Sequence, residues 1–231
     1  NVIVNDRIST GCAFVTYFSD GERKFIFHIG NTPAVLAPAP GKDKLRGLKF
    51  FHIMGCSVMA DTAFGKRIIN TAEAAKECGA EVSFDPNVRP ELMKDPESGK
   101  LIDEIISMTS VFMPGKSELR TLSGKEDIEE AVRDMFAKYP GMRLIALKNG
   151  KKGCIIYTRE ERVAFGVYAV PPVDATGAGD SFMAGLVYSM QQHYWLGDTI
   201  DFAMGAALAA LCRTLQVPMA QAVAFGDADN D

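Results

Sequence analysis

Short apolar segments alternate with helix-like segments along most of this 231-residue chain. Leu48 to Met54 (LKFFHIM) is an apolar run typical of a buried strand, the following segment from Asp61 to Cys78 has helical periodicity, and Glu81 to Phe84 is a second strand. A strand that is followed by a helix and a further strand normally enters a parallel sheet that helices cover. The expected fold class is therefore α/β, with a largely parallel central sheet flanked by helices on both faces in three layers.

The same alternation continues towards the C-terminus. It predicts helices over 101–109, 117–122, 128–138, 181–192 and 199–215, and strands over 111–113, 143–148, 154–158 and 162–170. Nearer the start, two β-branched and aromatic runs, 12–18 and 24–29, flank Ser-Asp-Gly and predict a hairpin. Because no repeat or linker interrupts the pattern, we expect a single domain over 1–231. We interpret the last eight residues (AFGDADND) as a short acidic tail.

The bulk composition argues against several classes of protein. A formal charge of -4 is unlike the basic balance of nucleic-acid binders, and no apolar run approaches the ~18–20 residues that span a bilayer. Five cysteines without a Cys-x-x-Cys pair suit neither a disulfide framework nor a zinc site. The composition thus favours a reduced cytoplasmic protein that has neither nucleic-acid nor membrane partners.

The segment VDATGAGDSF, residues 173–182, is the clearest candidate for a functional site. Gly177, Ala178 and Gly179 let the backbone approach a ligand closely, and a helix that begins near Ser181 adds unpaired N–H groups and a positive dipole end. Such an anion hole suits a phosphate, and Asp180 beside it can accept a proton from an attacking hydroxyl. This arrangement predicts phosphoryl transfer to an alcohol. The alternative is that Asp180 only caps its helix.

Five motifs together resemble those of the PfkB (ribokinase-like) carbohydrate kinases over most of residues 9–215. They are Asp-Ala-Thr-Gly-Ala-Gly-Asp at 174–180, Ser-Thr-Gly-Cys-Ala at 9–13, Asp-Gly-Glu-Arg at 20–23, Asp-Pro-Asn-Val-Arg at 85–89, and Lys-Asn-Gly with a further glycine at 148–153. The fourth motif is similar to a loop of the 2-keto-3-deoxygluconate kinase and fructokinase branches.

The resemblance implies a role for each matching residue. Asp180 would be the catalytic base, and the amides of Gly177, Ala178, Gly179 and Asp180 would stabilise the transferred phosphoryl group. The other implied site residues are Asn87 and Arg89 for substrate or phosphate, Lys148, Gly150 and Gly153 for the nucleotide, Glu118 for Mg²⁺ through water, and Asp174 and Thr176 for a monovalent cation such as K⁺.

The implied reaction is the ATP- and Mg²⁺-dependent phosphorylation of a small sugar or sugar acid, with 2-keto-3-deoxygluconate or fructose favoured. Relatives often pair through lid strands, which implies a homodimer. Simpler interpretations remain open for three features. In these interpretations, Lys148 forms a solvated turn with its neighbours Lys151 and Lys152, Glu118 is an exposed helix residue, and Asp85 only ends a strand.

Three departures from the family pattern motivate a rival hypothesis. Gly115 replaces the asparagine of the family's N-x-x-E motif, and 216–219 (QVPM) stands where a glycine-containing loop is expected. We also expect the domain to be incomplete at its N-terminus, without the family's lid and sugar-binding segment, so that a sheet edge is left open. The rival is a catalytically impaired ribokinase-like protein with a structural or regulatory binding role.

Overall fold

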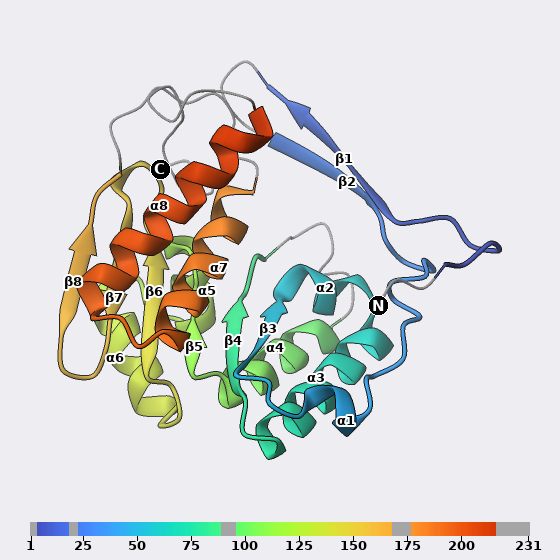
Figure 1. Cartoon of the computed structure of the whole chain (residues 1–231), viewed down its shortest axis with the longest axis horizontal. Helices are drawn as coiled ribbons and strands as arrows, with labels where there is room; N and C mark the ends of the chain where they lie inside the picture. The colour runs from blue at the N-terminus through green and yellow to red at the C-terminus, as the bar shows by residue number, and fades with distance from the viewer. Residues whose placement is uncertain (1–3, 19–22, 89–95, 168–176, 216–231) are drawn as a thin grey trace. The chain divides into compact units, whose positions relative to one another are not determined.

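The computed structural model describes residues 4–18, 23–88, 96–167 and 177–215 (Figure 1). The chain divides into two compact units, Asn1–Thr109 and Ser110–Asp231. Three predicted site residues, Arg89, Asp174 and Thr176, and the acidic tail lie outside the described residues. No helix in the described ranges is both long enough and apolar enough to cross a membrane.

The first unit contains a parallel strand pair with its crossover helix. Strands β3 (Phe50–Met54) and β4 (Glu81–Asp85) pair from Phe50 opposite Glu81 to Met54 opposite Asp85. Helix α3 (Thr62–Glu77) connects them, and α4 (Glu97–Met108) packs on α3. Two short helices, α1 (Lys42–Leu45) and α2 (Gly55–Ala60), also pack on α3. The predicted strand–helix–strand unit is confirmed.

Helix α3 follows directly from its sequence. Asp61 caps its start, where a side-chain oxygen accepts a hydrogen bond of 2.7 Å from the amide of Phe64. Gly65, Ile69, Ala72 and Ala75 recur every three or four residues and form its buried face. Helix α2 was not predicted because six residues are too few to establish a helical period.

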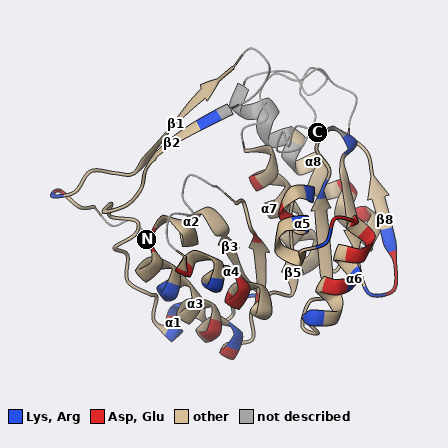
Figure 2. Cartoon of the chain, turned by 180° about the vertical axis from the view of Figure 1, so that it is seen from behind, with Lys and Arg blue, Asp and Glu red and all other residues tan. Residues whose placement is uncertain are grey.

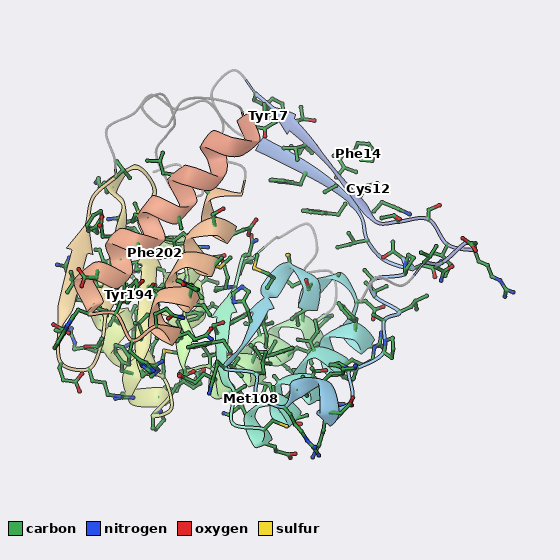
Figure 3. All side chains as sticks on the ribbon, viewed as in Figure 1. Cys12, Phe14, Tyr17, Met108, Tyr194 and Phe202 are labelled. Atoms are coloured by element: carbon green, nitrogen blue, oxygen red, sulfur yellow. The ribbon has the colours of Figure 1, made fainter. Side chains whose placement is uncertain are left out.

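The predicted hairpin is also present. Strands β1 (Cys12–Tyr17) and β2 (Arg23–His28) pair antiparallel, while their turn lies outside the described ranges. Every side chain of β1 is exposed, and Phe14 faces Ile26 across the pair with exposures of 62% and 61%. Figure 3 labels Cys12, Phe14 and Tyr17 on this hairpin. The hairpin therefore presents apolar surface to solvent.

The second unit has strands in the order β5 (Val111–Phe112), β6 (Leu144–Lys148), β7 (Cys154–Tyr157) and β8 (Arg162–Phe165). The first two are parallel, and β7 and β8 each join antiparallel. Helices α7 (Ala178–Gln191) and α8 (Leu196–Leu215) lie on one side of these strands and α5 (Lys116–Ser123) and α6 (Ile128–Lys138) on the other (Figures 1 and 2). The expected α/β layering is confirmed.

Close backbone packing gives a test of the first unit. A Cβ atom on Gly55 would lie 1.8 Å from the carbonyl oxygen of Pro86, whereas one on Gly99 would meet nothing within 4 Å. We expect Gly55→Ala to lower the free energy of unfolding by about 1–3 kcal/mol. The control Gly99→Ala, within α4, should leave it unchanged or raise it by up to about 1 kcal/mol. Urea unfolding followed by circular dichroism measures both, and equal stabilities would contradict the packing.

Candidate active site

The N-terminus of α7 carries a set of backbone donors. Gly177 precedes the helix with a φ of 79°, a left-handed conformation that favours glycine. The first amide of α7 that donates a helical hydrogen bond is that of Ser181, at 3.0 Å from the carbonyl oxygen of Gly177. The amides of Ala178, Gly179 and Asp180 donate to no acceptor within the described ranges, as expected for a first helical turn. This turn can therefore bind an anion.

Asp180 is the third residue of α7 and its side chain is exposed. The helix begins at Ala178, three residues earlier than predicted, so the carboxylate stands within the first turn. Its oxygens accept no hydrogen bond from any residue that the structure describes, and no described side chain caps this helix. The alternative of a simple capping aspartate thus finds no support in the described contacts.

No described residue packs against the middle of this turn. A Cβ atom built on Gly179 would meet no described atom within 4 Å, in contrast to the crowded Gly185 further along the same helix. Glycine at position 179 is therefore not required by packing against the described residues, which leaves room for a ligand at the amides.

Glu118 has a structural task in the loop after β5. One of its carboxylate oxygens accepts a hydrogen bond of 2.6 Å from the amide of Gly115, and the amide of Leu119 donates to the Gly115 carbonyl oxygen. Its side chain is half-buried, so the interpretation as an ordinary exposed helix residue is wrong. Sequence reasoning missed this capping, although a glutamate at the third helical position is its known signal.

The described acidic residues could hold a magnesium ion only together with water and substrate phosphates. They form no cluster of three or more ligating side chains with histidine or cysteine. Mg²⁺ commonly keeps several waters and binds one or two carboxylates together with substrate phosphates. Glu118 near the end of β5 fits such a site, because it supplies one carboxylate and leaves the other ligands to water and phosphate.

Lys148 is the last residue of β6 and only 8% exposed. Its amide donates to the carbonyl oxygen of Pro114 at 2.9 Å, and it forms a parallel bridge with Gly115. Lys148 is therefore no part of a solvated turn, although Lys152 is exposed. The bridge brings the loops after β5 and β6 together, and with them Glu118 and Lys148.

Gly150 and Gly153, in the loop after β6, differ in backbone conformation and in how closely other atoms approach them. Gly150 begins the 3₁₀ turn η1 (Gly150–Lys152) with a φ of 52°. Gly153 has a φ of 88°, and a Cβ atom there would lie 1.9 Å from the carbonyl oxygen of Phe165 in β8. Packing alone thus explains glycine at 153, whatever the loop binds.

In the first unit, the end of β4 holds the Asp-Pro-Asn turn. Asp85 is 2% exposed and one of its carboxylate oxygens accepts a hydrogen bond of 2.9 Å from the amide of Asn87. Asn87 has a φ of 36°, which is uncommon for a residue with a side chain. Asp85 therefore does more than end its strand, since it fixes the turn that presents Asn87.

Comparisons of sequence and of structure with known proteins both find similarity to carbohydrate kinases. The family model "pfkB family carbohydrate kinase" matches residues 1–221. The chain is 35% identical over 181 residues to fructokinase-2 of Solanum lycopersicum, covering 77% of this chain and 55% of the relative. It is 31% identical over 212 residues to fructokinase-1 of Oryza sativa subsp. japonica, covering 87% and 65%.

Two solved structures share the fold. A protein described as a ribokinase II from E. coli, in complex with ATP and Mg²⁺, superposes with a TM-score of 0.80 at 30% identity, covering 92% of this chain and 67% of that one. A fructokinase double mutant from Vibrio cholerae O395 with fructose, ADP and potassium gives 0.72 at 25%, covering 90% and 68%. The chain spans little more than half the length of the first curated relative.

The hydrogen bond between Glu118 and Gly115 can be tested by separating its acceptor from its charge. We expect Glu118→Ala to lower the free energy of unfolding by about 1 kcal/mol, because the N-terminal amide of α5 loses its acceptor. Glu118→Gln keeps an acceptor oxygen and should lose less. Thermal denaturation of the two variants checks this, and the hydrogen bond is not important if glutamine and alanine destabilise the protein equally.

Proposed function

Since the chain belongs to the pfkB family of carbohydrate kinases, we propose that the protein transfers the γ-phosphoryl group of ATP to a hydroxyl of a small sugar. The observation that carries this proposal is the first turn of α7, where an exposed carboxylate on Asp180 stands beside backbone amides that no described residue occupies. An anion site with a base beside it is what phosphorylation of an alcohol needs.

In the proposed step, Asp180 accepts the proton of the attacking sugar hydroxyl. The hydroxyl oxygen forms a bond to the γ-phosphorus as the bond to the leaving ADP oxygen breaks. The amides of Gly177, Ala178, Gly179 and Asp180, with the positive end of the α7 dipole, would stabilise the charge on the transferred group. Positioning and charge stabilisation supply most of the catalysis in such transfers.

The nucleotide would lie along the loops that the bridge between Gly115 and Lys148 joins. We propose that Gly150 and Gly153 border it, that the ammonium of Lys148 favours its phosphates, and that Glu118 helps to hold Mg²⁺ through water. A bound Mg²⁺ neutralises charge on the phosphate oxygens. Asn87 and Arg89 are proposed to contact substrate or phosphate, and Asp174 and Thr176 a K⁺ ion, as in the family expectation.

Fructose is the first substrate to test. Similar curated proteins include fructokinases from plants, and one similar structure holds fructose, ADP and potassium. The Asp-Pro-Asn-Val-Arg segment at 85–89 keeps 2-keto-3-deoxygluconate as the second choice. Coupled measurement of ADP release with ATP and a panel of sugars tests the proposal. Turnover of fructose or the sugar acid supports it, whereas nucleotide binding without turnover of any sugar favours the binding-only rival.

We also propose that two copies pair through the β1–β2 hairpin. The support is the exposed apolar pair Phe14 and Ile26, together with Tyr17 at 57% exposure. Covering such side chains would remove apolar surface from water. Light scattering of the purified protein would detect the dimer, and Phe14→Ser should shift it towards monomer. A monomer at every concentration tested would exclude this proposal.

A reducing, cytoplasmic location is proposed from the cysteines. Cys12, Cys56, Cys78 and Cys154 are all free. Burial raises the pKa of the Cys154 thiol to about 12, so that cysteine would stay protonated and unreactive at neutral pH. Free thiols of this kind are typical of a reducing compartment.

The role of Asp180 can be tested against a matched aspartate. Asp198 occupies the same third position in α8 as Asp180 does in α7, and both are exposed. We expect Asp180→Asn to lower kcat by about 10²–10⁴-fold, because the amide accepts no proton from the hydroxyl. Asp198→Asn should leave the rate unchanged. Retention of full activity by Asp180→Asn would remove it as the base.

The anion site can be tested with a second matched pair, Gly179 and Gly197. Each is the second residue of its helix, and a Cβ atom on either would meet no described atom within 4 Å. Gly179→Ala should keep the protein folded but place a methyl group at the amides, which would lower kcat/KM by up to about a hundredfold. Gly197→Ala should change neither property. Equal kinetics for the two variants would argue against an anion at Gly179.

A further inference from the structure

Four exposed aromatic side chains belong to the last turn of α7, the connecting turn and the first turns of α8. Tyr188, Tyr194, Trp195 and Phe202, here called the aromatic patch, are 49%, 44%, 84% and 40% exposed. The Phe202 ring stacks on Tyr188 at 5.4 Å between centroids and makes a T-shaped contact with Tyr194 at 5.8 Å. Figure 3 labels Tyr194 in the turn before α8 and Phe202 on the N-terminal part of α8. Contiguous exposed apolar surface of this kind often marks an interaction site.

The backbone beneath the aromatic patch is firmly held. A Cβ atom on Gly185 of α7 would lie 2.8 Å from the Cα of Ala203 in α8, so the two helices pack closely. The Thr199 hydroxyl of α8 donates to the Tyr194 carbonyl oxygen in the turn at 3.3 Å, and the Ser189 hydroxyl of α7 donates to the Thr199 carbonyl oxygen at 3.4 Å. The aromatic side chains are thus presented on a preformed support, which lowers the entropy lost on binding.

The charges carried by the α7 to α8 segment that bears the aromatic patch have one sign. Between positions 177 and 212 the chain carries Asp180, Asp198 and Asp201 and neither lysine nor arginine. Asp198 and Asp201 are exposed on the first turns of α8, among the residues of the patch. Electron-rich ring faces also attract cations, so both the carboxylates and the aromatic rings favour a positively charged partner.

We propose that the aromatic patch binds a basic protein segment in which lysine or arginine side chains alternate with apolar ones. Its cations would meet Asp198, Asp201 and the ring faces, while its apolar side chains would cover Trp195 and Phe202. A second copy of this chain suits the surface less well, because the two aspartates of each copy would face one another. An anionic lipid surface would be repelled for the same reason.

The aromatic patch is separate from the proposed kinase site and would bind a partner of its own. Tyr188 lies eight residues beyond Asp180 on α7, which is about 12 Å along the helix axis. The binding of a segment at the aromatic patch therefore does not require phosphoryl transfer, and the two can be tested separately.

Trp195 is the only tryptophan of the chain, so its fluorescence reports on this surface directly. The probe is a synthetic peptide of alternating leucine and lysine, titrated into the whole protein at low salt. We expect a blue shift of the emission and protection from iodide quenching, both weakened by added salt. A matched leucine–glutamate peptide should have no effect. An unchanged emission with the lysine peptide would overturn the proposal.

Variants distinguish this surface from general attraction to an acidic protein. Asp198→Asn with Asp201→Asn should weaken peptide binding about threefold to tenfold, and so should Tyr194→Ser. The control pair Asp103→Asn with Glu104→Gln removes the same charge from exposed positions of α4 and should not weaken it. Equal weakening by both pairs would overturn the proposal. A blue shift on raising the protein concentration alone, or on adding anionic vesicles, would also overturn it in favour of self-association or a membrane.

Discussion

Backbone contact at the ends of the strands is the constraint on which the rest of the structure depends. In each unit, a carbonyl oxygen occupies the space where a side chain would stand: Pro86 over Gly55 in the first and Phe165 over Gly153 in the second. Only glycine permits such an approach. The start of α2 can therefore lie against the Asp-Pro-Asn turn, and the loop after β6 can close against β8.

The polar groups of the candidate site depend on this tight frame. Buried strands such as β6 leave no place for charge along their length, so functional side chains lie where the strands end. The bridge between Lys148 and Gly115 joins the loops after β6 and β5, and the capping bond of Glu118 holds the loop after β5 in place. Each bond contributes only about 1 kcal/mol, but together they limit where a nucleotide could bind.

The helical hairpin of α7 and α8 combines two chemistries. Its first turn offers Asp180 and amides that no described residue occupies, whereas its far end exposes Trp195 and neighbouring rings. Close packing at Gly185 makes the hairpin rigid enough to present both. If a partner covers the aromatic patch, it would do so about two helical turns away from the proposed base.

The sequence by itself determined the α/β class and the family. Helix α6 was predicted with the bounds that are observed, because its periodicity and the proline and glycine after it are local signals. Tertiary structure decided what each side chain meets. The burial of Lys148, the capping by Glu118, the crowding at Gly153 and the exposure of the aromatic patch all depend on segments distant in sequence or on the exact start of a helix. Local patterns carry no information about such contacts, since burial is set by which elements pack together.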